Sequence, residues 1–378
     1  MIDVFIGGDV FLGDNRLEEI AKKADPAVLF KGLLDKISKS DLSIANLESP
    51  ILENGTALIK TGPVLKSTPQ SLAILKNAGF DLLTLANNHI LDYGEFGLSE
   101  TLKTIEFESM QFVGAGLNKV QARKPFKIQI KSKTIGVINV AENEFSTFNN
   151  RRDYGANPID LVDNYYDIQN FKKEVDFLFV IVHGGREHYN LPSPEFKKTL
   201  KFYADAGANA VVAHHTHCVS GFENYKGVPI FYGLGNFVFN NIGNNRPLWN
   251  IGLAVQFHIS EDNQCSFDLL SFNQCKGENY IIEMHNKREK ESFLDYINNI
   301  NKIIQNDSLL RKKWVEYVEN QEHAYLRHIF IKNSFVKKLV NRKILPENLF
   351  INENHKVLLS NLIRCETHRE IILNIFSK

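Results

Sequence analysis

Six short apolar runs lie in the first 240 residues of the chain, and amphipathic stretches separate them. The runs read DVFIGG, DLSIAN, DLLTLAN, KTIGVINVA, DFLFVIVHGG and ANAVVAHH, at residues 3–8, 41–46, 81–87, 133–141, 176–185 and 208–215. Runs that are apolar at nearly every position are typical of strands covered on both faces, as in a parallel sheet. Their alternation with helices predicts an α/β fold built on a mostly parallel sheet.

Two of the intervening stretches have clear helix boundaries. They read STPQSLAILKNAG at 67–79 and SPEFKKTLKFYADAG at 193–207. In each, a Ser or Thr directly precedes a Pro, and a Gly closes the segment. A capping hydroxyl followed by Pro favours a helix start, and Gly favours a helix end. We therefore expect a helix in each stretch.

The pattern changes after residue 250. The run IGLAVQFHI at 251–259 alternates strictly, which predicts a half-exposed antiparallel strand, and FDLLSF at 267–272 is expected to pair with it. Glycine is absent from residue 284 onward, and one helical face there collects Phe293, Leu294, Ile297, Ile300, Ile303 and Ile304. We predict two domains, residues 1–283 and a helical C-terminal appendage, residues 284–378.

Charge and cysteine content narrow the possible environments. The chain has 44 basic and 44 acidic residues, so no overall field attracts nucleic acid, and we expect no nucleic-acid partner. The four cysteines show no CxxC spacing, which predicts free thiols in a reducing compartment. Acidic Asp3 replaces the basic start of a signal peptide, and no run approaches the ~20 apolar residues of a membrane span. These features predict a cytoplasmic protein without a transmembrane segment.

Polar side chains that can bind metal follow five of the six predicted strands. They are Asp9, Glu48, Asn88 with His89, His183, and His215 with His217. One such cluster could simply form a turn, since Asn and Asp suit turns, and its histidine could be structural. In a parallel sheet, however, the carboxyl ends of the strands share one edge, where ligands gather. Five strands that end in this way favour a common metal site.

The donor types indicate which metals fit. Carboxylate, imidazole and amide oxygen suit Mn, Fe or Zn. Two such ions about 3.5–4 Å apart would polarise a phosphoryl oxygen and generate hydroxide from water. His215 and His217 are two residues apart, so on an extended segment both would face the same site. We interpret His214, between them, as structural.

Longer blocks of sequence carry a family resemblance. GDVFLG, NLESPI, GFDLLTLANNHILDYG, HGGREH and DAGANAVVAHHTHCVSGFENYKGVPIFYGLGNFVF occur in this order within roughly residues 1–260. Together they resemble the CapA-type capsule-synthesis (poly-γ-glutamate biosynthesis) proteins of the calcineurin-like metallophosphoesterase superfamily. The resemblance implies a metallophosphoesterase-like layered α/β sandwich, followed here by the helical appendage.

The same resemblance implies roles for individual residues. The metal ligands would be Asp9, Glu48, Asn88, His183, His215 and His217, with Glu48 as the bridging carboxylate. His89 would be the acid or transition-state stabiliser, Asp92 would fix the tautomer of His89, and Asn87 would shape the turn. The superfamily usually has Asp-x-His after the first strand, but the third position here is Phe11. One metal then lacks a ligand, as in other CapA-type proteins, so we expect one or two divalent ions.

Three smaller features are candidates for binding. Arg186, Glu187 and His188 form either a substrate-facing loop or a solvated one, and Lys60 and Lys66 either contact an anionic substrate or are solvated. The stretch IKNSFVKKLVNRKIL at 331–345 has five basic and no acidic residues. It could make peripheral contact with a membrane or an acidic glycan assembly, or it could be a helix with a basic solvent face.

The expected function is a metal-dependent hydrolase or transferase in capsule or surface-polymer biosynthesis. It would act on a phosphoester of an anionic polymer or a phosphorylated small molecule, through metal-bound hydroxide. Amide chemistry on polyglutamate is an alternative that follows the family name. A non-catalytic, metal-stabilised module of a polymer-assembly complex is another. A nuclease or nucleotidase is disfavoured, because net charge is zero and Asp-x-His is missing.

Overall fold

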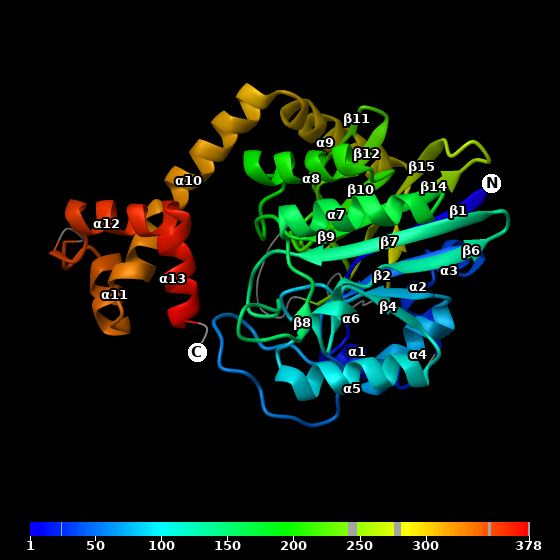
Figure 1. Cartoon of the computed structure of the whole chain (residues 1–378), viewed down its shortest axis with the longest axis horizontal. Coiled ribbons are helices and arrows are strands. Elements are labelled where there is room, and N and C mark those ends of the chain that lie inside the picture. Colours follow the sequence, from blue (N-terminus) through cyan, green and yellow to red (C-terminus); the bar gives the residue numbers. More distant parts are fainter. Residues whose placement is uncertain (24, 241–247, 276–280, 347–348, 377–378) are drawn as a thin grey trace. The chain divides into compact units, whose positions relative to one another are not determined.

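The computed structural model describes residues 1–23, 25–240, 248–275, 281–346 and 349–376. The chain divides into two compact units, Met1–Asp307 and Ser308–Lys378. Strands and helices alternate through most of the first unit, whereas the described part of the second is helical (Figure 1). No helix in the described ranges has the length and apolar character needed to cross a membrane. All four cysteines are free thiols, as expected.

The first sheet is built around β1 (Ile2–Phe11). Its strand order is β16-β15-β14-β1-β2-β3-β4, and β13 (Asn236–Phe239) also pairs with β1. Four strands are parallel to a neighbour: β13 pairs with β1, and β2 (Leu42–Leu47), β3 (Leu82–Thr84) and β4 (Gln111–Val113) follow β1 in that order. The antiparallel strands are β14 (Ile251–Ile259), β15 (Cys265–Asn273) and β16 (Glu283–Met284). The predicted pairing of 251–259 with 267–272 is confirmed.

The second sheet has the order β11-β12-β10-β9-β7-β6. Its parallel strands are β7 (Lys133–Ala141), β9 (Phe177–His183), β10 (Ala210–His214) and β12 (Val228–Phe231). The antiparallel outer strands are β6 (Phe126–Ile130) and β11 (Phe222–Tyr225). A separate small ladder joins β5 (Ala115–Gly116) to β8 (Gly155–Ala156).

The two sheets pack face to face. Val4 and Ile6 of β1 share one buried cluster with Phe179 and Ile181 of β9, while Phe5 belongs to a second cluster on the opposite face of β1. This follows from the two-residue period of a strand. The second cluster includes side chains of α1 (Asn15–Ala21), α2 (Pro26–Phe30), α3 (Leu34–Lys39), α4 (Pro69–Ala78) and α5 (Gly94–Phe107).

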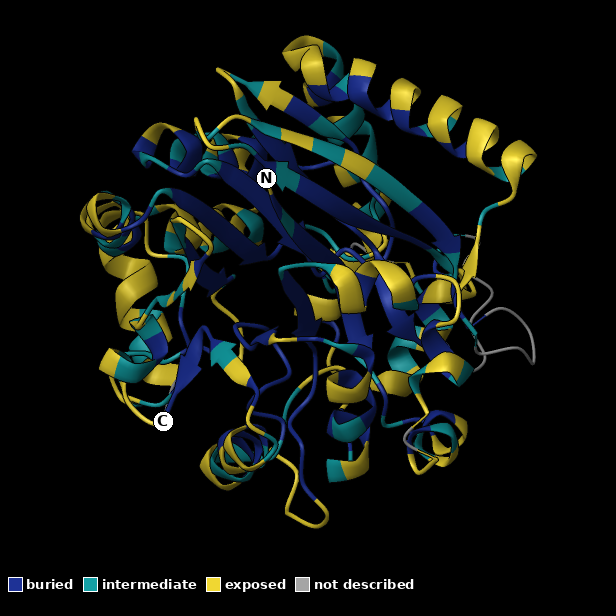
Figure 2. Ribbon diagram, turned by 90° about the vertical axis from the view of Figure 1, so that its right-hand side faces the viewer, coloured by how far each residue is buried: buried dark blue, intermediate teal, exposed yellow. Residues whose placement is uncertain are grey.

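Helices also cover the outer face of the second sheet. They are α7 (Leu161–Phe171), extended by the short helix η1 (Lys172–Glu174), and α8 (Pro194–Ala206), while α6 (Lys119–Arg123) packs beside β5 (Figure 1). In Figure 2 most strands are dark blue, and the helices around them turn yellow faces outward. The layers are thus helix, sheet, sheet and helix. The predicted layered α/β sandwich is confirmed.

The predicted strands and helices form, but the strands divide between two sheets. The runs at 3–8, 41–46 and 81–87 contribute to the first sheet, and the other three contribute to the second. A run that is apolar on both faces does not reveal which sheet it joins. The two helices with predicted boundaries are α4 and α8.

Helix α9 (Lys287–Gln305) packs on the first unit. Phe293 and Ile297 enter the cluster between the sheets, and the Asn301 Oδ1 accepts a hydrogen bond from the Phe222 backbone N–H (2.7 Å). The first unit therefore extends to Asp307, whereas the sequence predicted a boundary after 283. The helical pattern of α9 was read correctly, but its buried face packs against the sheets. Beyond it lie α10 (Asp307–Phe330), α11 (Ser334–Asn341), α12 (Glu353–Arg364) and α13 (Glu366–Phe376).

The contact between β1 and β13 leaves no room for a side chain at Gly8. A Cβ there would lie 2.1 Å from the Gly235 carbonyl oxygen, a backbone atom that cannot rotate away. We expect Gly8→Ala to lower the free energy of unfolding by about 3 kcal/mol, because the strands must separate. Urea denaturation measures this. Gly62→Ala is the control, because its Cβ meets no atom within 4 Å and only its φ of +86° costs energy, about 1–2 kcal/mol. Equal losses would refute the close approach.

Candidate metal centre

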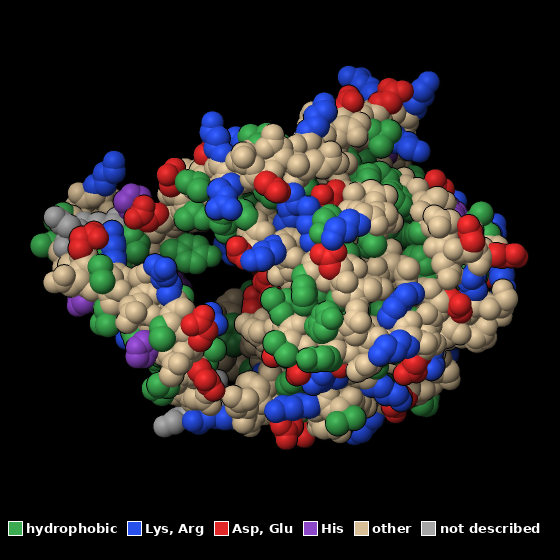
Figure 3. Space-filling model, turned by 45° about the horizontal axis from the view of Figure 1, so that its top comes forward, with side chains coloured by type: hydrophobic (Ala, Val, Ile, Leu, Met, Phe, Trp, Pro, Cys, Tyr) green, Lys and Arg blue, Asp and Glu red, His purple; other side chains and the backbone are tan. Residues whose placement is uncertain are grey.

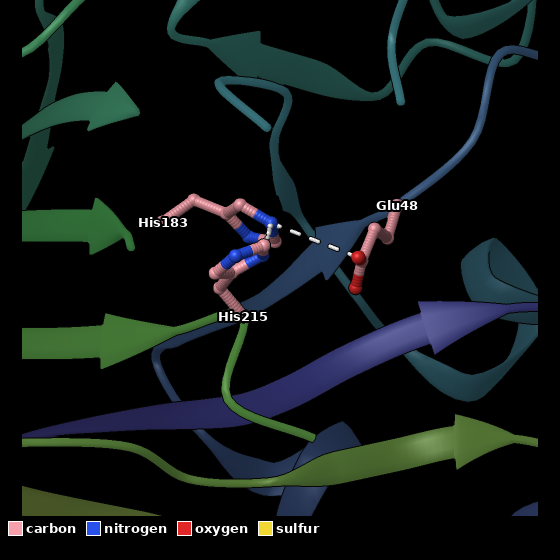
Figure 4. A group of neighbouring side chains, drawn as sticks. All are labelled: Glu48, His183 and His215. Carbon is pink, nitrogen blue, oxygen red and sulfur yellow. Dashed lines mark hydrogen bonds and ion pairs between the residues drawn. The ribbon is translucent and has the colours of Figure 1, made fainter. Parts of the chain in front are cut away.

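The six predicted metal ligands lie together at one end of the two sheets. Five of the six supply donor atoms that form two groups, Glu48 with His183 and His215, and Asp9 with Glu48 and His217, and within each group the atoms lie within 4.8 Å of one another. The sixth, Asn88, places its Oδ1 3.1 Å from His183 Nε2. Figure 4 shows the first group, with His183 and His215 at strand ends of one sheet and Glu48 after a strand of the other. Glu48 belongs to both groups.

Glu48 is a buried carboxylate without a hydrogen-bond donor. It follows β2, and its backbone N–H donates to the Val10 carbonyl (2.9 Å). Neither Oε atom has a hydrogen-bond partner among the described residues. The nearest bases are His183 Nε2 and His217 Nε2, 3.6 and 3.5 Å from Oε1. Burial, followed by the charge of Asp9, raises the pKa of Glu48 well above its usual value. Burying a carboxylate without hydrogen-bond donors costs free energy, and a cation at this position would offset that cost.

Asp9 is also buried, but donors hold both of its oxygens. Asn46 Nδ2 donates to Oδ1 (2.8 Å), and the His215 backbone N–H donates to Oδ2 (3.0 Å). Burial raises the pKa of Asp9, while His217 and these hydrogen bonds act in the opposite direction. The carboxylate is thus fixed in orientation beside His217.

The imidazole nitrogens converge on the same space. His183 Nε2 is 3.1 Å from Asn88 Oδ1 and 3.0 Å from His215 Nδ1. Burial and then the neighbouring imidazoles lower the pKa values of both histidines well below the usual range. They are therefore neutral, the form that binds metal. His217 Nδ1 is 2.9 Å from Asn236 Oδ1, which leaves its Nε2 toward Glu48. Nitrogen and oxygen donors of this kind fit Mn, Fe or Zn.

The HHTH segment reaches the site through an unusual backbone. Strand β10 ends at His214, and His215 and His217 have φ values of +88° and +51°. The extended segment expected here is therefore wrong, although both rings reach the cluster. His214 is buried, which lowers its pKa to about 3, and its Nδ1 lies 3.7 Å from Asp9 Oδ1.

His89 is held by its neighbours rather than by the cluster. Its Nδ1 is 2.7 Å from Asp92 Oδ2, which also accepts from the Leu65 backbone N–H (2.7 Å). Lys60 Nζ donates to Asp92 Oδ1 and lies 3.3 Å from His89 Nδ1. Asn87 shapes the turn, since its Oδ1 accepts from the His89 backbone N–H (3.1 Å). His89 Nε2 is left without a hydrogen bond to any described residue.

The remaining predicted residues occupy different surroundings. Lys66 Nζ donates to the Glu53 carbonyl (2.7 Å), and Lys60 pairs with Asp92 as described. The His188 ring stacks on that of His217 at 5.8 Å, and Glu187 Oε2 lies 3.7 Å from His188 Nε2. Arg186 is one of the charges that, after burial and the imidazoles, lower the pKa of His215. A substrate contact by these five residues stays a prediction.

Two acidic residues at the site were missed in the sequence. Glu142 and Glu144 follow β7 and form a third donor group with His215. Glu142 Oε1 accepts from the Gly185 N–H (3.0 Å), and burial raises its pKa to about 6. Burial likewise raises the pKa of Glu144. The run at 133–141 ends directly before them, so the strand-end rule could have found both. Asn46 is the last residue of the run at 41–46 and Asn236 is the first residue of β13, and neither was singled out as a candidate.

An aromatic cluster occupies the place of the missing histidine. The Phe11 ring lies 5.0 Å from Phe239, which lies 5.2 Å from Trp249. The His217 ring is 5.0 Å from Phe239 and 4.7 Å from Trp249. Phe11 therefore packs against this aromatic wall and offers no donor. The group of Asp9, Glu48 and His217 is correspondingly poorer in ligands than the group to which Asn88 is adjacent.

Known proteins match most of the first unit. Residues 3–241 match the family model described as "Bacterial capsule synthesis protein PGA_cap". The capsule biosynthesis protein CapA of Bacillus anthracis is 28% identical, and the match covers 71% of this chain and 67% of that protein. The PGA biosynthesis protein CapA of Bacillus subtilis (strain 168) is 29% identical, with 69% of each covered. A putative 5'-nucleotidase structure from Staphylococcus aureus, in complex with alpha-ketoglutarate, has a TM-score of 0.41 at 14% identity and covers 77% of this chain and 57% of that one.

Proposed function

This chain belongs to the bacterial capsule synthesis protein family PGA_cap, and from that premise we propose that it is a metal-dependent hydrolase or transferase of phosphoesters in surface-polymer biosynthesis. The match confirms the resemblance seen in the sequence. Glu48 carries the proposal, because its two buried oxygens accept no hydrogen bond from a described residue and its carboxylate serves both donor groups. The substrate we propose is a phosphorylated small molecule or a phosphate-bearing anionic polymer.

The metal would be held by residues from both sheets. Glu48, Asn88, His183 and His215 would hold one ion, and Asp9, Glu48 and His217 would hold a second, weaker one. A divalent ion of the Mn, Fe or Zn type supplies Lewis-acid polarisation of a phosphoryl oxygen and activation of water. The neutral imidazoles suit this role, and so does the Glu48 carboxylate, which accepts no hydrogen bond from a described residue.

The chain's own contribution to the reaction would centre on His89. Asp92 accepts from Nδ1, so Nε2 is the nitrogen that faces the substrate. During hydrolysis a water molecule would lose a proton to solvent as its oxygen forms a bond to phosphorus, while the bond to the leaving oxygen breaks. His89, in its imidazolium form with a proton on each nitrogen, would give the Nε2 proton to that leaving oxygen and become neutral. Lys60 would keep Asp92 in place through their buried ion pair.

A purified preparation tests the proposal directly. We expect about one or two Mn, Fe or Zn ions per chain by mass spectrometry. We also expect turnover of some phosphomonoesters, diesters or diphosphates in a substrate panel. Chelation should abolish turnover, and added metal should restore it.

Other outcomes would favour the alternatives. Cleavage confined to a γ-linked glutamate peptide would favour amide chemistry on polyglutamate, the alternative that follows from the sequence resemblance. Bound metal without turnover on any substrate of the panel would favour a non-catalytic, metal-stabilised module. The aromatic side chains beside His217 are consistent with this outcome, because they leave the group of Asp9, Glu48 and His217 short of a ligand. Absence of both metal and turnover would refute the proposal.

A further inference from the structure

Charge is distributed unevenly between the two units, although the chain as a whole is neutral. Residues 308–378 contain thirteen Lys and Arg but seven acidic residues, and residues 1–307 contain 31 and 37. Within the second unit, the 24 residues 323–346 contain six Lys and Arg and no acidic residue. Such asymmetry points to an anionic partner for the basic part.

The basic residues surround a short amphipathic helix. The Asn333 side chain accepts from the backbone N–H groups of Phe335 (2.9 Å) and Val336 (3.2 Å), which fixes the start of α11. At 3.6 residues per turn, its apolar side chains fall on one side and its two lysines on the other; the apolar ones are Phe335, Val336, Leu339 and Val340. Val340 is buried in the unit, whereas Phe335 is 66% exposed.

The rest of the stretch continues the same combination. Ile344, just after α11, is 60% exposed. Five basic side chains accompany it in the stretch, and none forms an ion pair with another described residue; they are Lys332, Lys337, Lys338, Arg342 and Lys343. Elsewhere in the unit, by contrast, Lys313 and Lys356 pair with glutamates. Figure 3 shows Lys and Arg side chains among acidic and apolar ones over the visible face of the molecule.

We propose that this α11 surface, formed by Phe335, Lys338, Arg342, Lys343 and Ile344, binds the surface of an anionic lipid membrane. Charge complementarity selects the partner, because basic side chains that pair with no described residue are attracted to anionic headgroups, about fivefold in affinity per basic side chain. The exposed Phe and Ile would enter the headgroup boundary, as the apolar face of an interfacial helix does. A soluble polyanion would bind the cations and leave these apolar side chains in water.

Vesicle sedimentation with the full chain tests the proposal. We expect binding to phosphatidylcholine vesicles that contain about one third phosphatidylglycerol, loss of binding at high salt, and little binding to phosphatidylcholine alone. Phe335→Ser and the double variant Lys338→Glu, Lys343→Glu should each lower partitioning by about tenfold or more. The controls are Phe107→Ser and the double variant Lys23→Glu, Lys31→Glu, which make the same changes at exposed positions of the first unit.

Three results would overturn the proposal. Equal binding to neutral vesicles would remove the role of charge, and absence of binding to anionic vesicles would remove the partner. Binding to soluble polyglutamate as tight as to anionic vesicles, with no effect of Phe335→Ser, would indicate a polyanion site. Because the readout is lipid binding, failure of this proposal leaves the proposed phosphoester chemistry untouched.

Discussion

Glu48→Gln is expected to remove bound metal almost completely and to lower phosphoester turnover by about 10³-fold or more. The reason is its shared position, since Glu48 is the carboxylate common to both main donor groups. A glutamine keeps the size of the side chain but loses the charge that draws a cation. Metal content per chain and turnover at saturating metal are the two measurements.

Thermal unfolding gives a third measurement on the same variant. In the metal-free protein, Glu48→Gln replaces a buried carboxylate for which the described part of the chain supplies no hydrogen-bond donor. We therefore expect the metal-free variant to be at least as stable as the metal-free parent, but without the rise in Tm when metal is added. Glu53→Gln is the matched control, because Glu53 is exposed. A Glu48→Gln protein that keeps its metal would refute the assignment.

His89→Ala should separate chemistry from metal binding. We expect metal content to stay nearly unchanged while turnover falls by about 10²–10⁴-fold, the range for loss of an acid–base group. The reason is geometric, because Asp92 holds Nδ1 and Asn88, not His89, faces the histidine cluster. Metal analysis and steady-state kinetics on the same preparation measure both quantities.

Asn88→Ala is the comparison for that result. Its amide oxygen lies 3.1 Å from His183 Nε2, so its loss should weaken metal occupancy, and excess metal should restore part of the activity. If His89→Ala loses its metal, the two roles are reversed. If it loses neither metal nor activity, His89 is structural and the non-catalytic module becomes the better reading.

The strand-end pattern predicted where most of the cluster lies. Asp9, Glu48 and His183 stand in or directly after long apolar runs whose ends are sharp in the sequence, so their common edge could be inferred. The pattern did not reveal that the runs form two sheets, because a strand buried on both faces looks the same in either. It also missed the turn at His215 and His217, since positive φ at a non-glycine residue depends on tertiary contacts.

Residues that orient the ligands were harder to predict than the ligands. Asn46 lies near the end of β2 and Asn236 begins β13, and the role of each is recognisable only once its partner, Asp9 or His217, is known. Helix α9 illustrates the same limit. Its period predicts a helix with one buried face, but the surface that buries Phe293 is formed by strands distant in sequence.

The left-handed backbone at His215 and His217 bears on how such a chain can evolve. A non-glycine residue in this conformation costs roughly 1–2 kcal/mol, and glycine at the same place would avoid that cost. Backbone strain alone would therefore favour glycine at 215 and 217, but each replacement would delete a buried imidazole and leave a cavity, which costs more than the strain that it relieves. The strained conformation and the rings that it carries into the cluster are therefore retained or lost together.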